Sequence, residues 1–376
     1  MRIKWLIWYL LAAMPLLGQS PLNWKGQVSA WTNVNDSHDW PVWLGACFLP
    51  QINGAYQAGK DSRFHFEVSA NLNGSFGCHP FDSINHDGAL KAYRFWMSFS
   101  TLRFEIRAGL QKINFGSATN LRPLMWFDRM DPRDPLQMTD GVWGLLSRYY
   151  FQNNANIWFW FLYGNNDPKT WELGATTRQY PEWGGRFQYP AGKGELAMTY
   201  HHRVVDSYSL EALLPASGNI PEDRLGLDGK WDVGPGLWFE AVWLRKQHDI
   251  GALTHQHMIT LGVDNTFVIG QGLNVVFEHL LFGYNEEAFR FEENISFSSL
   301  SLSYPLNMND QITALMYYDW THNGSYNMVT WRRYLNKVSL YAMVYANPKS
   351  YQVPFNNSET SLFSGKGVQI MAVWSF

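Results

Sequence analysis

The segment 112–140 combines acidic, basic and aromatic residues within one long stretch. Its charged side chains are Arg122, Asp128, Arg129, Asp131, Arg133, Asp134 and Asp140. A connection of this length inside a compact domain is usually functional or disordered, and Met125, Trp126 and Phe127 make it too aromatic for disorder. We expect a short helix with Asn120 as N-cap that ends at Asp131–Pro132. Asp131 and Asp134 have a simpler alternative role, which is to cap and turn the chain.

A second group of charges lies on the polar faces of alternating segments. These residues are Arg94, Arg103, Arg107, Arg148 and Arg186, the wall arginines, with Glu105 and Trp96 on the same faces. An Arg or Lys at mid-membrane on a lipid-facing surface costs roughly 2–4 kcal/mol, so we expect these groups to face an aqueous interior. If the wall arginines face the acidic residues of 112–140 across a narrow passage, the two sets of charges would set an electrostatic field across it. The alternative is that they pair with Glu67, Glu105 and Glu195 inside a filled interior.

Other chemistry is less well supported. His255 and His257 share a strand face without a matching carboxylate, and the aspartates of 112–140 lack the spacing of a calcium loop. A hydrolase would need a serine–histidine pair with an orienting group, and no nucleophile motif accompanies His65 or His279. We therefore predict no catalytic residue, no metal and no cofactor.

These charges must be positioned by strands, because segments of alternating polarity recur along the whole chain. In 63–73, for example, Phe64, Phe66 and Val68 alternate with His65 and Glu67. Such segments have the length that a tilted strand needs to cross an outer membrane. We predict about 18 strands, with 16 as the alternative. The expected segments are 27–32, 42–49, 63–73, 91–99, 102–111, 141–150, 156–164, 183–189, 195–203, 224–231, 237–246, 257–267, 273–282, 294–304, 311–320, 326–335, 338–347 and 367–376.

The N-terminus and the composition agree with an exported barrel. Residues 1–20 carry Arg2 and Lys4 before an apolar run that is too short to span a membrane, as in a secretory signal. The signal's removal leaves 21–376 with a net charge of about −5, which argues against a nucleic-acid partner.

Aromatic residues make up 16% of the chain, as expected for rings at two membrane interfaces, and mean hydropathy is −0.26. We place Trp158 and Trp160 in such a lipid-facing girdle, whereas Trp96 points inward.

The two ends of the expected barrel and its cysteines complete the pattern. The chain ends on an alternating strand, 367–376, whose last residue is Phe376, and this end resembles the signature that the barrel assembly machinery reads. An even strand number places both termini on the periplasmic side. Cys47 and Cys78 are the two cysteines, and the sequence leaves open whether they pair.

The chain resembles the porin-like outer-membrane β-barrels of Gram-negative bacteria. The resemblance rests on the run from Gly109 to Gly116 ahead of Asp131–Pro132–Arg133–Asp134–Pro135, and on the long connection after the fifth strand. It implies an antiparallel up-and-down barrel in the outer membrane, with 112–140 as a constriction loop, passive diffusion of small polar or anionic solutes, and a homotrimer or a larger complex. A plugged barrel that serves as a subunit of an outer-membrane complex is the second hypothesis, and a barrel enzyme is the third.

Overall fold

The computed structural model describes residues 22–36, 41–78, 84–130, 133–206, 209, 218–291, 294–349 and 362–376. The expected signal 1–20 lies outside these residues and stays a prediction. Eighteen strands form one sheet. They are β1 (Asn23–Asn35), β2 (Val42–Gln57), β3 (Arg63–Cys78), β4 (Ile84–Ser100), β5 (Phe104–Gln111), β6 (Val142–Tyr150), β7 (Asn156–Leu162), β8 (Glu182–Ala191), β9 (Gly194–Asp206), β10 (Asn219–Asp232), β11 (Gly236–Lys246), β12 (His255–Phe267), β13 (Leu273–Asn285), β14 (Asn294–Pro305), β15 (Asp310–Asp319), β16 (Gly324–Leu335), β17 (Val338–Ala346) and β18 (Lys366–Ser375).

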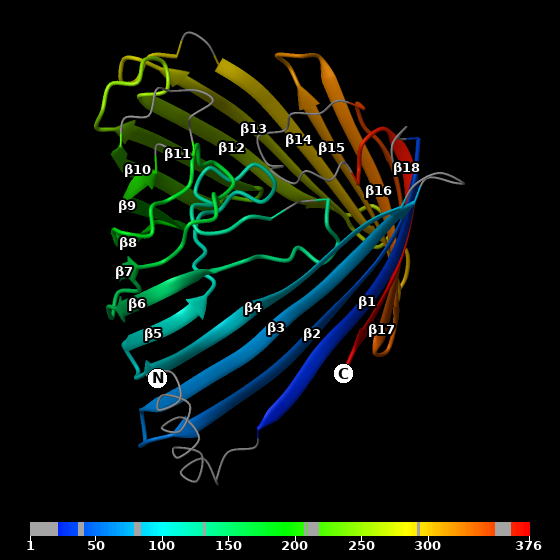
Figure 1. Ribbon diagram of the computed structural model, residues 1–376, viewed down its shortest axis with the longest axis horizontal. Coiled ribbons are helices and arrows are strands. Elements are labelled where there is room, and N and C mark those ends of the chain that lie inside the picture. Colours follow the sequence, from blue (N-terminus) through cyan, green and yellow to red (C-terminus); the bar gives the residue numbers. More distant parts are fainter. Residues whose placement is uncertain are drawn as a thin grey trace.

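Each strand pairs antiparallel with the next along the chain, and β18 pairs with β1, which closes the barrel (Figure 1). The closing register aligns Gln27 with Ser375 and Asn35 with Gly367. Closure removes the two edge strands that an open sheet would expose. The predicted all-β fold, its up-and-down topology and the count of 18 strands are confirmed.

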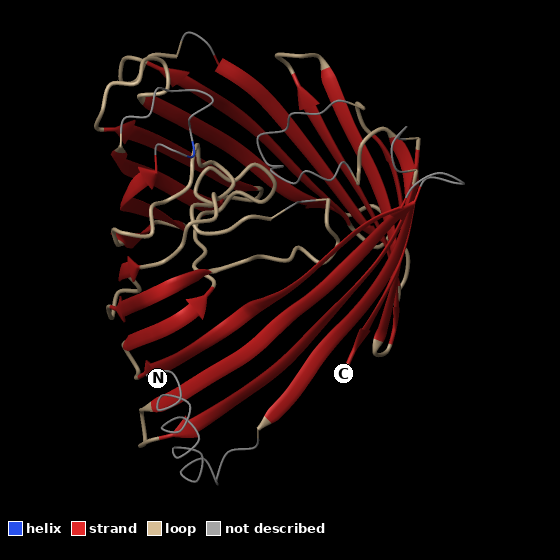
Figure 2. Cartoon of the chain, in the orientation of Figure 1, coloured by secondary structure: helices blue, strands red, loops and turns tan. Residues whose placement is uncertain are grey.

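Long and short connections alternate around the barrel (Figure 2). The turns at 101–103, 192–193 and 336–337 lie at the end that carries both chain termini, and the connections 112–141 and 163–181 lie at the other end. In outer-membrane barrels the short turns are periplasmic and the long loops extracellular. We call 112–141 the inner loop and 163–181 the second loop. Among the described residues, no helix is long and apolar enough to cross a membrane.

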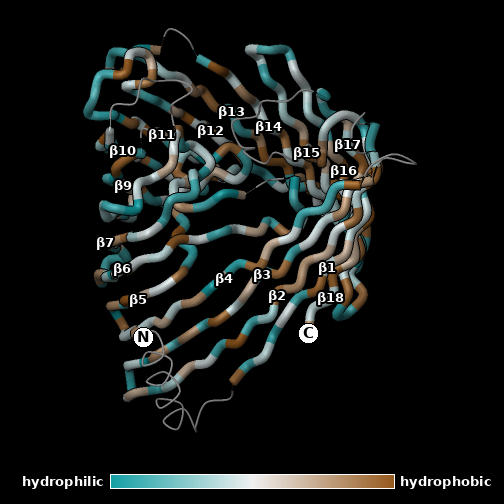
Figure 3. Tube along the Cα trace, viewed as in Figure 1, coloured by the Kyte–Doolittle hydropathy of each residue, from teal (hydrophilic) through white to brown (hydrophobic). Residues whose placement is uncertain are grey.

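The inward and outward faces follow from the strand register. On β3 and β4 the residues Glu67 and Trp96 are paired neighbours on the interior face, whereas Val68 and Phe95 point outward and are exposed. Figure 3 shows the resulting alternation of polar and apolar residues along the strands. The outward apolar residues form the surface that acyl chains would contact.

Two details differ from the sequence prediction or complete it. The strand expected to begin at residue 102 begins at Phe104, because Thr101 to Arg103 form the short turn between β4 and β5. Arg103 is therefore an exposed turn residue and does not line the interior. Cys47 and Cys78 are both free, since Cys47 lies opposite Asn73 in the register and Cys78 lies opposite Val42.

A charge placed on the outer wall tests this assignment of faces. Leu261 lies outward in the middle of β12, and Leu237 lies outward at the periplasmic end of β11. We expect Leu261→Arg to lower the free energy of unfolding from lipid vesicles by about 2–4 kcal/mol and Leu237→Arg by about 1 kcal/mol or less. Equal costs in urea titrations would contradict the placement of the membrane.

Candidate functional site

The inner loop leaves the wall at β5, crosses the interior and docks on the far side of the barrel before it returns to β6 (Figure 1). Its tip contacts strands that are distant in sequence. The Thr260 hydroxyl of β12 donates to the carbonyl of Leu121 over 2.9 Å, and the Asn120 side chain donates to Ser299 Oγ of β14 over 3.3 Å. The interior at this level is therefore divided by the loop.

Two wall carboxylates hold the tip of the inner loop. Glu240 of β11 accepts the backbone N–H groups of Ala118 (2.8 Å) and Leu124 (3.0 Å). Glu278 of β13 accepts those of Thr119, Asn120 and Leu121, at 2.6, 2.8 and 2.7 Å. The indole of Trp238 donates to Glu278 over 3.1 Å. Both groups are 0% exposed, and these N–H donors satisfy oxygen atoms that have no access to water.

This anchoring explains why the predicted helix is absent. The segment from Asn120 to Met130 consists of turns, bends and irregular backbone. A helix beginning at Asn120 would leave its first N–H groups without intrahelical acceptors, and here the Glu240 and Glu278 carboxylates accept the amides of 118–121 and 124 while the chain stays open. The prediction of a helix was wrong for 120–130: the amide of Leu124, which a helix would direct to the carbonyl of Asn120, donates to Glu240 instead.

Aromatic rings fill the space between the inner loop and the near wall. Phe115 stacks on Trp160 with ring centroids 5.8 Å apart, and Phe127 packs edge-on against Trp160 at 5.3 Å. The indole of Trp160 donates to His201 Nδ1 over 3.1 Å. The placement of Trp158 and Trp160 in a lipid-facing girdle was therefore wrong, since Trp160 is 3% exposed and both rings face inward.

The second loop is held inside the barrel by a buried network of charges. The Glu172 carboxylate contacts Arg203 at 3.2 Å and Arg224 at 2.7 Å, and both arginines also contact Glu222 of β10. Burial alone would raise the pKa of Glu172, but the two guanidinium groups outweigh it and hold that pKa below its ordinary value. The Trp171 indole donates to the carbonyl of Arg122 over 2.7 Å, so the second loop is hydrogen-bonded to the inner loop.

Each interior wall arginine has a partner. Arg107 contacts Glu105 at 2.7 Å, and Arg148 contacts the same carboxylate at 3.6 Å. Arg107 lies over the ring of Trp96, with 4.4 Å from its guanidinium carbon to the ring centroid. Arg186 and Asp228 form a bidentate pair at 2.6 and 2.8 Å.

Arg94 has a different role from the other wall arginines. Its guanidinium donates to the Thr139 carbonyl and hydroxyl and to the Asp140 carbonyl, at 2.8 to 3.1 Å. It therefore anchors the C-terminal end of the inner loop, and the wall arginines form no unpaired row of positive charge.

The charged residues of the inner loop are also engaged, mostly with each other. Arg122 donates to the Asn114 side chain, Arg129 contacts Asp140 at 3.3 Å, and Arg133 lies over the ring of Phe363 at 5.2 Å. Asp134 accepts the backbone N–H groups of Leu136 (2.9 Å) and Met138 (3.3 Å), which is a turn-forming role. Asp131 lies outside the described residues.

Asp128 is buried, and its nearest cation is Lys112, with 4.0 Å between Lys112 Nζ and Asp128 Oδ2. Burial raises the pKa of the Asp128 carboxyl above its ordinary value, and this effect outweighs Lys112 and the N–H of Gly141. The acids and the wall arginines therefore do not face each other across an open gap.

The interior is packed on one side of the inner loop and polar on the other. An apolar cluster joins the loop to the interior faces of β6, β7 and β11 to β17; its members include Leu121, Trp126, Leu146, Met258, Phe297 and Tyr345. On the interior faces of β3 and β4, by contrast, Asn73, Asp87 and Lys91 stay exposed. The inner loop is therefore displaced toward the far wall.

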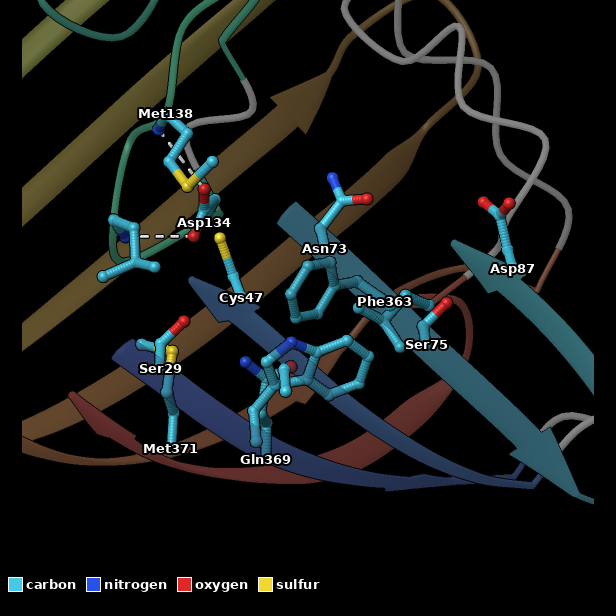
Figure 4. Close-up of a pocket in the computed structure, with 15 residues that line it drawn as sticks. Ser29, Cys47, Asn73, Ser75, Asp87, Asp134, Met138, Phe363, Gln369 and Met371 are labelled. Carbon is cyan, nitrogen blue, oxygen red and sulfur yellow. Dashed lines mark hydrogen bonds between the residues drawn. The ribbon is translucent and has the colours of Figure 1, made fainter. Parts of the chain in front are cut away.

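A cavity of about 290 Å³ lies on the polar side (Figure 4). It is bounded by the interior faces of β18 and β1 to β4 and by Asp134, Leu136 and Met138 of the inner loop. Its polar lining residues are Ser29, Asn73, Ser75, Asp87, Asp134 and Gln369. Cys47 points into this space and donates to Asn71 Oδ1 over 3.2 Å.

The histidines considered for catalysis or metal binding lie apart from this cavity. His279 contacts Ser298 Oγ through Nδ1 at 2.9 Å and Ser296 Oγ through Nε2 at 3.3 Å, so a serine–histidine pair exists that the sequence did not reveal. It lies on the outer wall, where the Trp320 indole donates to Ser298 over 2.9 Å. No carboxylate orients this histidine among the described residues, and the described part of the chain contains no group of metal-ligating side chains.

No family model matches this sequence, and no curated protein matches it either. Solved structures match over almost the whole chain. Salmonella typhi OmpF in complex with daunomycin superposes with a TM-score of 0.50 and 10% identity, covering 94% of this chain and 97% of that chain. The trimer form of OmpT, an outer membrane protein of Vibrio cholerae, gives a TM-score of 0.51 at 9% identity, covering 95% and 99%. The chain has the fold of the porin-like outer-membrane β-barrels.

Removal of the Glu278 carboxylate tests the anchoring of the inner loop. In Glu278→Ala the buried N–H groups of Thr119 to Leu121 lose their acceptor, so we expect hydrogen exchange at these amides to rise by about 100-fold or more. Glu287→Ala, which removes an exposed carboxylate in the connection after β13, is the matched control and should leave them unchanged. Unchanged protection in Glu278→Ala would contradict the anchoring.

The raised pKa of Asp128 gives a pH-dependent prediction. Its folded-state value lies above the ordinary 3.8, so the charged carboxylate destabilises the fold at neutral pH, and protonation removes this cost as the pH falls through the folded pKa. Asp128→Asn lacks the cost at every pH. We expect the variant to exceed wild type in urea stability at pH 7, with a gap that shrinks toward pH 4. A gap that grows on acidification would show that the charged form is favoured.

Proposed function

We propose that this chain is an outer-membrane channel of the porin type that admits small polar solutes by passive diffusion. The supporting observation is the asymmetry of the interior: Glu240 and Glu278 are fully buried under the inner loop, whereas Asn73, Asp87 and Lys91 on the opposite wall stay exposed. Solutes would pass between residues 133–139 of the loop and the wall of β18 and β1 to β4. The loop would act as a steric sieve.

The charges along this route favour uncharged polar solutes over anions. Asp87 and Asp134 line the cavity there, and its lining contains no Lys or Arg. Glu105 and Asp228 compensate Arg107, Arg148 and Arg186. Electrostatic guidance of anions needs uncompensated positive charge, so we propose hydroxylated neutral solutes as the main cargo.

A plugged barrel that serves as a subunit of an outer-membrane complex is the second candidate. It is favoured by the apolar cluster that extends through the interior from Leu146 to Tyr345. An apolar cluster in the interior stabilises the barrel whether or not solutes pass through it, so it also fits a barrel with a structural role.

Location and assembly follow from the same proposal. We propose export through a cleaved signal at 1–20 and insertion into outer-membrane lipid by the barrel assembly machinery, which would read the last strand and Phe376. A homotrimer is supported by the trimer form recorded for Vibrio cholerae OmpT.

We propose no catalytic activity, because the Ser298–His279 pair lies on the outer wall without an orienting carboxylate among the described residues.

Single-channel conductance in a planar bilayer tests the route. Asn73 lines the cavity, and its neighbour Leu72 points outward. We expect stable conductance from wild type, a loss of roughly half or more of it in Asn73→Trp because the indole narrows the route, and no change in Leu72→Trp. No conductance from a folded barrel would overturn the proposal in favour of the plugged barrel.

A further inference from the structure

A second cavity, of about 340 Å³, opens at the extracellular end of the wall where the strands differ in height. β4 pairs with β5 only from Phe95 to Ser100, so its upper part, from Ile84 to Tyr93, has no strand partner on that side within the described chain. The cavity lies beside this part of β4, against the beginning of β6 and the second loop. It includes the outward residues Leu110 and Trp143, and therefore reaches the outer face of the barrel.

Positive charge exceeds negative charge in this cavity. Its cations are Lys91, Lys169 and Arg178, and its carboxylates are Asp140 and Asp167. Asp140 is engaged by Arg129 at 3.3 Å. Within the described chain none of the three cations forms an ion pair with a carboxylate. The Arg178 guanidinium donates instead to the neutral Asn166 side chain over 2.8 Å. The excess of positive charge in the lining of this cavity therefore favours the binding of an anion.

The remaining lining adds groups that suit a sugar. Asn71, Asn165 and Asn166 supply amides, and Tyr93 and Trp143 supply aromatic surface. Asn165 is fixed by two hydrogen bonds to the Trp143 backbone, at 2.7 and 3.0 Å. Amides and rings bind hydroxylated molecules, and cations bind phosphate. We propose that this cavity binds a phosphorylated sugar.

Two sources share this chemistry, a free sugar phosphate and the phosphorylated sugar headgroup of an outer-leaflet glycolipid. Basic pockets at the membrane surface bind anionic headgroups. The outward Phe95 and Trp143, with ring centroids 6.1 Å apart, lie where the acyl chains of a glycolipid bound by its headgroup would contact the barrel. The site shares no lining residue with the cavity on the proposed channel route, although its Lys91 lies on an interior face.

Calorimetry with the full-length folded protein tests the site. The probes are glucose 1-phosphate, glucose and inorganic phosphate, and vesicles that contain lipid A or only phosphatidylcholine. We expect glucose 1-phosphate or lipid A vesicles to bind wild type, and the affinity to fall about tenfold or more in Lys91→Ala/Arg178→Ala. Arg178→Lys with Lys91 intact should bind like wild type. Lys193→Ala/Lys337→Ala removes two cations from periplasmic turns as the matched control and should bind like wild type.

Each outcome decides the proposal. Binding of the free sugar phosphate alone identifies a soluble ligand, and binding of lipid A vesicles alone identifies the glycolipid headgroup; both support the site. Equal affinity for glucose or for inorganic phosphate, an equal loss in the control, or no binding of any probe by wild type would overturn it. Heat-shifted gel mobility verifies that each variant is folded.

Discussion

The interior of this barrel depends on the capture of backbone N–H groups by two carboxylates. A wide barrel does not by itself fix the position of a long loop, because the loop carries backbone donors that must be satisfied wherever it lies. Glu240 and Glu278 satisfy five of these donors at the tip of the inner loop, on the wall opposite the point where the loop begins. The two carboxyl groups are tolerated at 0% exposure because each meets several converging donors.

The remaining features of the interior follow from this anchoring. Once the tip lies against β11 and β13, Phe115 and Phe127 are placed against Trp160, and Trp171 closes the packing from the second loop. The second loop is fixed in turn by Glu172 among buried arginines. Removal of one partner from such a buried group typically costs about 3–5 kcal/mol. Along the wall of β18 and β1 to β4, the described part of the inner loop leaves a cavity of about 290 Å³, so the route that we propose lies there.

The strands of the barrel wall are well predicted from the sequence, because the alternation of polar and apolar residues along a strand is a local property. All 18 strands were expected, since lipid outside and polar groups inside impose a period of two. The prediction failed where both faces of a strand are apolar. β7 reads Ile157 to Leu162 without a polar residue, so the pattern could not reveal that Trp158 and Trp160 face inward.

The site is less predictable because its partners are distant in the chain. Glu240 and Glu278 could be recognised as carboxylates inside otherwise apolar strands, which cannot face lipid, but their acceptor role toward residues more than 100 positions away could not. The helix predicted at Asn120 failed for the same reason, since local capping signals ignore the wall. The wall arginines were expected on interior faces, which holds for Arg94, Arg107, Arg148 and Arg186. The alternative of pairing with Glu105 holds for Arg107 and Arg148. Asp228, the partner of Arg186, lies 42 positions away and was not indicated by spacing.

A cross-link between the loop tip and the far wall tests the central claim most directly. The Nδ2 atom of Asn120 and the Oγ atom of Ser299 are 3.3 Å apart, so the two positions are neighbours that a disulfide can probe in Asn120→Cys/Ser299→Cys made in a Cys47→Ser/Cys78→Ser background. We predict that the disulfide forms in membranes without a catalyst and leaves single-channel conductance unchanged, because the route does not require movement of the tip. Failure to cross-link in a folded barrel, or conductance that is lost on oxidation and restored on reduction, would contradict the account.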